Sequence, residues 1–113
     1  MTNQQWSKAV KDAAGNACQY CGSKNKLESH HILPRCDFPH AASLLINGVC
    51  LCHSCHVKAH GGTFYRPIGN PDCVLPGKYT KAEILAVKSF VASLRDRVNR
   101  AIEETIERDN ENE

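Results

Sequence analysis

Two pairs of cysteines with C-x-x-C spacing constrain this sequence more than any other feature. Cys18 pairs with Cys21 and Cys52 with Cys55, which together supply the four thiolates of a closed tetrahedral zinc site. The total of seven cysteines is odd and argues against a fully paired disulfide framework. The alternatives are two unrelated pairs or a redox dithiol, although the βαβ pattern of a thioredoxin-like dithiol is missing. We expect a structural zinc on these four residues, with a folded insert between the pairs.

Length and composition fit a single small domain over residues 1–113. Hydrophobic residues make up 42% but aromatic residues only 6%, so the core holds few large side chains and a metal would reinforce it. The first residues are polar, without the layout of a signal peptide, and no apolar run approaches the roughly 20 residues that cross a bilayer. We therefore expect a cytoplasmic protein, in a compartment that keeps thiols reduced.

The net charge of +2 hides an asymmetry along the chain. Residues 101–113 contain six acidic residues and one arginine, whereas the first hundred residues contain 13 Lys and Arg against six Asp and Glu. A basic body of this kind accumulates near polyanions such as DNA or RNA. The alternative is that the charge only keeps the protein soluble.

Local patterns predict an α+β chain. Thr2 and Gln5 have the spacing of a capping box, and Gly15 with Asn16 ends the helix that they begin. Asn47 and Gly48 mark a turn. The elements expected in the first half are a helix over 2–14, a strand over 27–33, a short helix within 41–46, a strand over 49–52 and a brief helix over about 54–60.

The second half is expected to be a loop and one long helix. Residues 63–79 are rich in proline and glycine, and a capping box at Thr80 and Glu83 opens a helix over about 80–107. An acidic tail, 108–113, follows, and we expect residues 109–113 to be frayed. A seam of apolar residues either packs on the domain or forms a coiled-coil dimer. Its members are Ile84, Val87, Val91, Leu94, Val98 and Ala101, widened by Leu85 and Phe90.

The histidines predict a second, open metal site. His56 and His60 are four residues apart and so share one face of a helix. His30 and His31 are adjacent on a predicted strand, so their side chains point to opposite sides. One of them can be a third ligand, while the other stays free to take a proton. Three protein ligands with open positions describe a catalytic metal rather than a structural one.

These motifs, in this order, resemble the HNH endonucleases, specifically the small zinc-bound members from phages and bacteria. The resemblance covers about residues 18 to 60 and implies an HNH core of about 18–62. It includes both cysteine pairs, the segment from Glu28 to Pro34, Asn47, and the His56-x-x-x-His60 helix. It implies a small ββα-metal finger with a four-cysteine structural zinc. In this chain an N-terminal helix and a long C-terminal helix would flank that finger.

The resemblance also implies roles for single residues. His31 matches the general base that deprotonates the attacking water, and Asn47 matches the residue that orients this base by hydrogen bonding. His30, His56 and His60 match the ligands of the catalytic cation. His30 stands where many members have Asp, and His56 where many have a second Asn, so this chain is an all-histidine variety.

The implied reaction is metal-dependent hydrolysis of a DNA phosphodiester that leaves 5′-phosphate and 3′-hydroxyl ends. Imidazole ligands suit Mn²⁺, Ni²⁺, Co²⁺ or Zn²⁺ better than Mg²⁺, although Mg²⁺ can serve with water and phosphate as further ligands. For contact with the DNA backbone we single out Arg35 after the strand, Lys58 on the histidine helix, and Arg66 in the proline-rich loop.

The biological setting is a hypothesis only. The chain resembles phage proteins that act beside the terminase during genome packaging, and also restriction or homing nucleases, so a bacterial host cytoplasm or nucleoid is the expected location. The main rival is a non-catalytic zinc module that docks on DNA or protein. A third possibility is a scaffold that assembles as a homodimer through the C-terminal helix, whereas the enzyme could also be a monomer.

Overall fold

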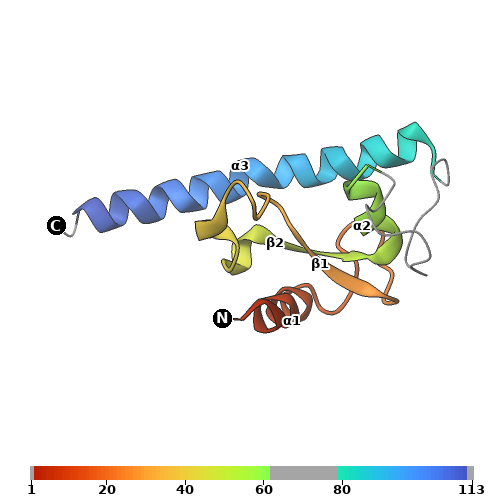
Figure 1. Ribbon diagram of the computed structural model, residues 1–113, viewed down its shortest axis with the longest axis horizontal. Coiled ribbons are helices and arrows are strands. Elements are labelled where there is room, and N and C mark those ends of the chain that lie inside the picture. Colours follow the sequence, from red (N-terminus) through yellow and green to blue (C-terminus); the bar gives the residue numbers. More distant parts are fainter. Residues whose placement is uncertain (1, 62–78, 112–113) are drawn as a thin grey trace.

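A computed structural model describes residues 2–61 and 79–111, with side chains up to residue 105. The loop expected over 63–79 therefore lies almost wholly outside the described residues, as does Arg66. The observed class is α+β, as predicted (Figure 1). The elements are α1 (Asn3–Ala13), β1 (Leu27–His31), η1 (Pro39–Ala41), η2 (Leu45–Asn47), β2 (Gly48–Cys52), α2 (His53–Ala59) and α3 (Lys81–Glu111).

The first helix begins where the sequence predicts. Thr2 is its N-cap: the Thr2 hydroxyl accepts from the Gln5 backbone N–H, and the Gln5 side chain accepts from the Thr2 backbone N–H. This reciprocal pair satisfies two of the amide groups that a helix start leaves unpaired. Trp6 and Val10 are buried on one face of α1.

The two strands form an antiparallel hairpin in which Leu27 pairs with Cys52 and His31 with Gly48. β1 ends at His31, two residues earlier than predicted. Its continuation leaves the ladder because the Leu33 backbone N–H donates to the Asn47 side chain instead of to a strand. The predicted helix within 41–46 is replaced by two short 3-10 turns, η1 and η2.

The hairpin is covered on both faces. In Figure 1, α1 lies below the strands and α3 above them. Trp6 and Val10 pack with Cys50 under the hairpin, while the larger cluster above it includes Val87 and Val91 of α3. Gly48 permits the lower contact, since a Cβ there would collide with Val10 and lie 3.0 Å from the Trp6 ring.

The long helix α3 starts with the predicted capping box, because the Glu83 backbone N–H donates to the Thr80 hydroxyl. Val87, Val91 and Val98 are buried, so the apolar seam packs on the domain. Leu85 does not widen this seam, because it is 65% exposed.

The predicted end of α3 is wrong. The helix continues through Glu111, so residues 109–111 are helical rather than frayed. No glycine or proline interrupts residues 81–111, and glutamate and arginine are good helix formers.

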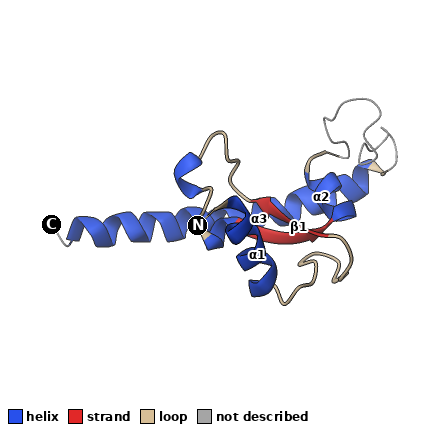
Figure 2. Cartoon of the chain, turned by 60° about the horizontal axis from the view of Figure 1, so that its bottom comes forward, coloured by secondary structure: helices blue, strands red, loops and turns tan. Residues whose placement is uncertain are grey.

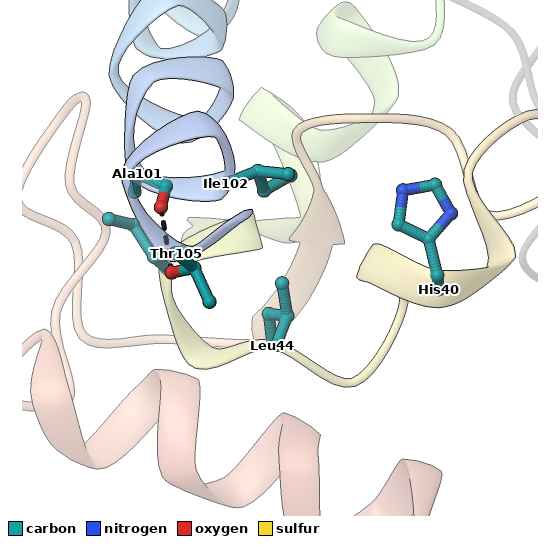
Figure 3. A pocket seen from close by; sticks show the side chains of 6 residues that line it. His40, Leu44, Ala101, Ile102 and Thr105 are labelled. Atoms are coloured by element: carbon teal, nitrogen blue, oxygen red, sulfur yellow. Dashed lines mark hydrogen bonds between the residues drawn. The ribbon is translucent and has the colours of Figure 1, made fainter. Parts of the chain in front are cut away.

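Beyond the strands, the loop that carries η1 and η2 approaches the C-terminal half of α3 (Figure 2). Leu44 and His40 of this loop face Ala101, Ile102 and Thr105 of the helix across an apolar pocket (Figure 3). Among the helices that the structure describes, none combines the length and the apolar character needed to cross a membrane.

Candidate active site

The four cysteines of the C-x-x-C pairs lie together. Their Sγ atoms are all within 4.8 Å of one another, and the Sγ atoms of Cys21 and Cys52 are 3.6 Å apart. A tetrahedral zinc with Zn–S bonds of about 2.3 Å requires sulfur atoms about 3.8 Å apart. The donor set therefore fits a structural zinc, which would tie the turn after α1 to the junction of β2 and α2.

The protonation of these thiols depends on local hydrogen bonds. Burial opposes the thiolate of Cys18, but backbone N–H groups of Cys21, Cys52 and Tyr20 outweigh it and lower the pKa to about 7. Burial raises the pKa of Cys52 and, much more strongly, that of Cys55. One thiolate is thus ready near neutral pH, and the others would lose their protons to the bound metal.

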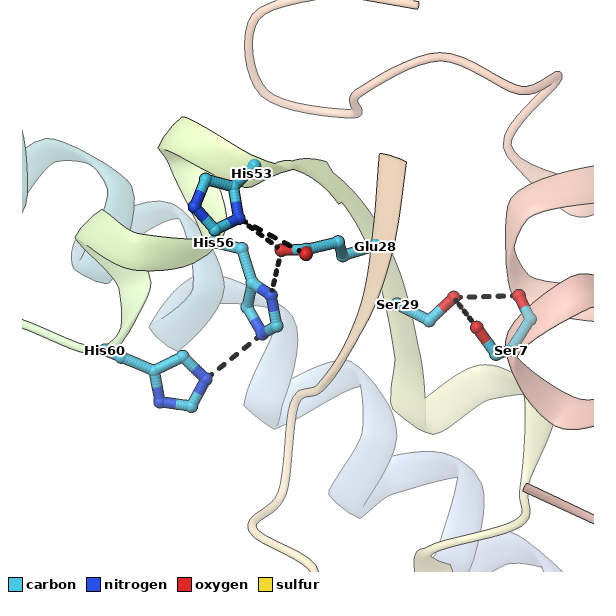
Figure 4. Close-up of polar contacts among 6 residues, drawn as sticks. All are labelled: Ser7, Glu28, Ser29, His53, His56 and His60. Atoms are coloured by element: carbon cyan, nitrogen blue, oxygen red, sulfur yellow. Dashed lines mark hydrogen bonds and ion pairs between the residues drawn. The ribbon is translucent and has the colours of Figure 1, made fainter. Parts of the chain in front are cut away.

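Strand β1 sends its side chains alternately to two sides of the hairpin. Figure 4 shows Ser29 directed at Ser7 of α1 and Glu28 directed at the histidines of α2. The same alternation places His30 on the α2 side and His31 on the α1 side. One short strand therefore contributes to two separate groups of polar residues.

The three histidines expected as ligands of an open metal site come together on the α2 side. One ring nitrogen from each of His30, His56 and His60 lies within 4.8 Å of the others, and the Nε2 atoms of His56 and His60 are 3.1 Å apart. These separations suit three imidazoles around one divalent cation with bonds of about 2.1 Å. His60 is exposed and is the C-cap of α2 rather than part of the helix.

Glu28 fixes the orientation of the histidines on α2. The Nδ1–H of His56 donates to Glu28 Oε1 at 2.8 Å, and His53 Nδ1 lies 3.2 Å from both carboxylate oxygens (Figure 4). With Nδ1 of His56 occupied, its Nε2 carries the lone pair and faces His60. A carboxylate behind a metal-binding histidine holds the ring and raises its basicity as a ligand.

The electrostatic environment of the three-histidine cluster favours neutral imidazoles and a bound anion. Burial and the neighbouring His56 and His60 lower the pKa of His30 to about 3, so this ring stays unprotonated and able to bind a metal. Burial also lowers the pKa of His60. The positive charges of Lys88 and Arg95, seven residues apart on α3, act in the same direction on His60 and His30 respectively.

His31, the expected general base, has a different environment. Its ring stacks on the indole of Trp6 with centroids 4.0 Å apart and an angle of 7° between the planes. Its Nε2 lies 3.0 Å from the carbonyl oxygen of Ala42. Because a carbonyl only accepts, Nε2 carries the proton in this contact, and the lone pair of the neutral ring is on Nδ1.

Asn47 does not hydrogen-bond to His31. It is fully buried, accepts from the Leu33 backbone N–H at 2.7 Å, and donates to the carbonyls of Leu33 and Ala41. The expectation of a direct hydrogen bond to the base was therefore wrong. Asn47 closes the loop between the strands, and this loop presents the Ala42 carbonyl to His31.

The residues expected to contact DNA differ in their exposure to solvent. Arg35 is exposed in the loop after β1. Lys58 is half-buried: its ammonium lies 3.5 Å from Glu83 and 5.0 Å from the centre of the Tyr79 ring. Lys58 thus ties α2 to α3, which does not fit a lysine held out toward phosphate.

Sequence reasoning missed Glu28 and Trp6 as parts of this site. Glu28 lies two residues before His30, so strand periodicity alone would have put both on one side of the hairpin. No local pattern connects Trp6 with His31, because the two are far apart in the chain and only the packing of α1 brings them together.

An antiparallel hairpin followed by a helix, with histidines from both around one point, is the arrangement of the ββα-metal class. Residues 18–62 match the family model for HNH endonuclease. The match covers less than half of the chain, and the four-cysteine cluster is consistent with the zinc-bound subtype of that family. Comparison with curated proteins and with solved structures gave no match. The match supports a nuclease-type function in general, with DNA as substrate or partner.

Proposed function

We propose that this protein is a metal-dependent DNA endonuclease that hydrolyses phosphodiester bonds. The observation that carries the proposal is the division of the histidines: three rings converge on one point, and a fourth is held apart with its Nε2 occupied. A purely structural zinc module needs only the four cysteines. The histidine set would then have no chemical task.

His31 is the proposed general base, with Nδ1 as the nitrogen that accepts a proton from the attacking water. The hydrogen bond from Nε2 to the Ala42 carbonyl keeps the ring in this tautomer. His30 and His31 are consecutive at the C-terminal end of β1. A phosphodiester bound across this end of the strand would be flanked by the base on one side and by the three-histidine cluster on the other.

His30, His56 and His60 would hold a divalent cation, whose chemistry would be to polarise the phosphate and stabilise the charge that grows on it. Imidazole ligands favour Mn²⁺, Ni²⁺, Co²⁺ or Zn²⁺, and Mg²⁺ would depend on oxygen ligands from water and phosphate. Glu28 would keep Nε2 of His56 directed at the cation.

The proposed substrate is DNA, bound mainly through its backbone. Lys88 and Arg95 bring positive charge from α3 to the histidine cluster, and the exposed Arg35 extends it along the loop after β1. Contacts to phosphate oxygens position a nucleic acid but carry no sequence information. We therefore expect weak sequence preference.

Relaxation of a supercoiled plasmid, with each cation in turn, tests the proposal. Wild type should cut, and His31→Ala should reduce the rate by about 10²–10⁴-fold, the contribution of a positioned base. His40→Ala is the matched control, because His40 is exposed on the same loop and lies in the apolar pocket instead. Equal rates for all three proteins would refute the assignment of the base, and a wild type that binds zinc and DNA but never cuts would favour the docking module.

We also propose, from the resemblance to small phage nucleases, that packaging proteins such as a terminase are partners. Purified packaging proteins should then stimulate cutting by this chain. An unchanged rate on their addition would count against this partner while leaving the nuclease proposal intact.

A further inference from the structure

Trp6 lies outside the family match but stacks on His31, the proposed general base. It belongs to α1, before residues 18–62, and its side chain is 2% exposed. A core tryptophan of a small domain would ordinarily pack against apolar side chains. Here a polar ring, the imidazole of His31, stacks on one face of the indole.

The contacts of Trp6 restrict both the imidazole and its hydrogen-bond acceptor. The nearly parallel stack at 4.0 Å prevents the ring from tilting toward α1. The indole Nε1–H donates to the Leu44 carbonyl at 2.9 Å, two residues from the carbonyl of Ala42 that receives the proton of His31 Nε2. Trp6 therefore contacts the face of the ring and also holds the loop that fixes its edge.

A general base gains its effect only if its lone pair points at the water in the reactive geometry. Rotation of the ring by half a turn about the Cβ–Cγ bond exchanges Nδ1 with Cδ2 and Nε2 with Cε1, so it would turn the lone pair of Nδ1 away from the water. His31 is the last residue of its strand, so the strand alone does not prevent this rotation. The stack on Trp6 and the hydrogen bond to the Ala42 carbonyl together prevent it.

We propose that Trp6 is a positioning residue that holds His31 in the Nε2–H tautomer and aims its Nδ1 at the substrate. The proposal rests on the nuclease function proposed above. It assigns to α1 a part in the reaction rather than in stability alone.

Three variants test the proposal on plasmid cleavage, with kcat and KM measured separately. Trp6→Leu should lower kcat by about tenfold or more with little change in KM, since the effect is on positioning and not on binding. Trp6→Phe keeps an aromatic face but loses the Nε1–H bond to the Leu44 carbonyl, so its kcat should lie between those of Trp6→Leu and wild type. Val10→Ala is the matched control, since Val10 is buried in the same cluster of α1 but only Trp6 stacks on His31.

Nitrogen NMR of His31 gives a second readout that needs no activity. Wild type should show a proton on Nε2, and Trp6→Leu should show a mixture of tautomers. The proposal is overturned if wild type carries the proton on Nδ1, or if folded Trp6→Leu has the kcat of Val10→Ala. If Trp6→Leu fails to fold, Trp6→Phe and the tautomer in wild type still decide the question.

Loss of cutting in His31→Ala with normal cutting in Trp6→Leu would reject this inference alone. Normal cutting in His31→Ala would instead reject His31 as the general base.

Discussion

At the scale of single residues, adjacent histidines have opposite environments. His30 is buried among other imidazoles and its pKa falls to about 3. His31 is stacked on an indole and anchored to a backbone carbonyl. The identical side chains acquire different chemistry because neighbouring strand residues point to opposite sides of the hairpin. Glu28 shares the His30 side and controls the histidines of α2.

Replacing Glu28 should weaken the exchangeable metal site. In Glu28→Gln, the charge behind His56 is lost, and we expect the affinity for Mn²⁺ or Ni²⁺ to fall by about 10–100-fold. Calorimetric titration of zinc-loaded protein measures this. Asp12→Asn serves as the control, because Asp12 is an exposed acid paired with Lys8; the same loss in both variants would point to a general charge effect.

Acid should destabilise the protein through His30. In the unfolded chain this ring takes a proton near its ordinary pKa of 6.5, whereas the folded ring does so only near pH 3. The unfolded state thus binds more protons across this window, so stability falls as the pH is lowered from 6.5 toward 3. His30 alone should remove about 1 kcal/mol between about pH 6.5 and 5.5.

Urea denaturation at several pH values measures that slope. The proper comparison is His30→Asn, which lacks the titrating ring but keeps the zinc thiols that also respond to acid. Parallel slopes for the two proteins would show that His30 does not titrate as its surroundings indicate.

At the scale of elements, α2 and α3 form the framework of the site. α2 runs back beside β1, so that His53 and His56 meet Glu28, and His56 and His60 meet His30. α3 packs its valines onto the hairpin and leaves Lys88 and Arg95 exposed near the histidines. Because Val87, Val91 and Val98 are buried against the hairpin, they are not available for a coiled-coil dimer.

Removing the positive charge of α3 should weaken DNA binding without affecting folding. For Lys88→Ala with Arg95→Ala we expect the dependence of log K on log salt to become shallower by about two, one for each lost phosphate contact. Fluorescence anisotropy of a labelled duplex at several salt concentrations provides the slope. Arg100→Ala is the control, being exposed on the same helix, and an unchanged slope in the double variant would exclude α3 from the DNA interface.

At the scale of the whole molecule, the proposed zinc connects segments that otherwise have little core between them. The molecule is elongated, with extents of 53 × 28 × 27 Å, and its apolar clusters lie on separate faces of one hairpin. The cysteine cluster joins the end of the α1 turn to the start of α2. A domain this small has a stability of about 5–15 kcal/mol, similar to what a structural zinc contributes.

Removal of zinc should therefore unfold the protein. A chelator strong enough to extract the metal should abolish the fold, and the fluorescence of Trp6, the chain's single tryptophan, should move to that of an exposed indole. Cys21→Ser should reproduce this, whereas Cys36→Ser should not, because Cys36 is exposed and lies outside the cluster. A native spectrum after complete zinc removal would contradict a structural role.

The sequence by itself determined where α1 and α3 begin and the residue types of both clusters. Capping boxes, cysteine spacing and the i, i+4 histidines are local signals, and local signals depend only on neighbours in the chain. The stack of Trp6 on His31, the bonds of Asn47 to Leu33 and Ala41, and the pairing of Lys58 with Glu83 were decided by tertiary structure. Each joins segments whose distance in space no local pattern fixes, because it depends on how helices pack on the two faces of the hairpin.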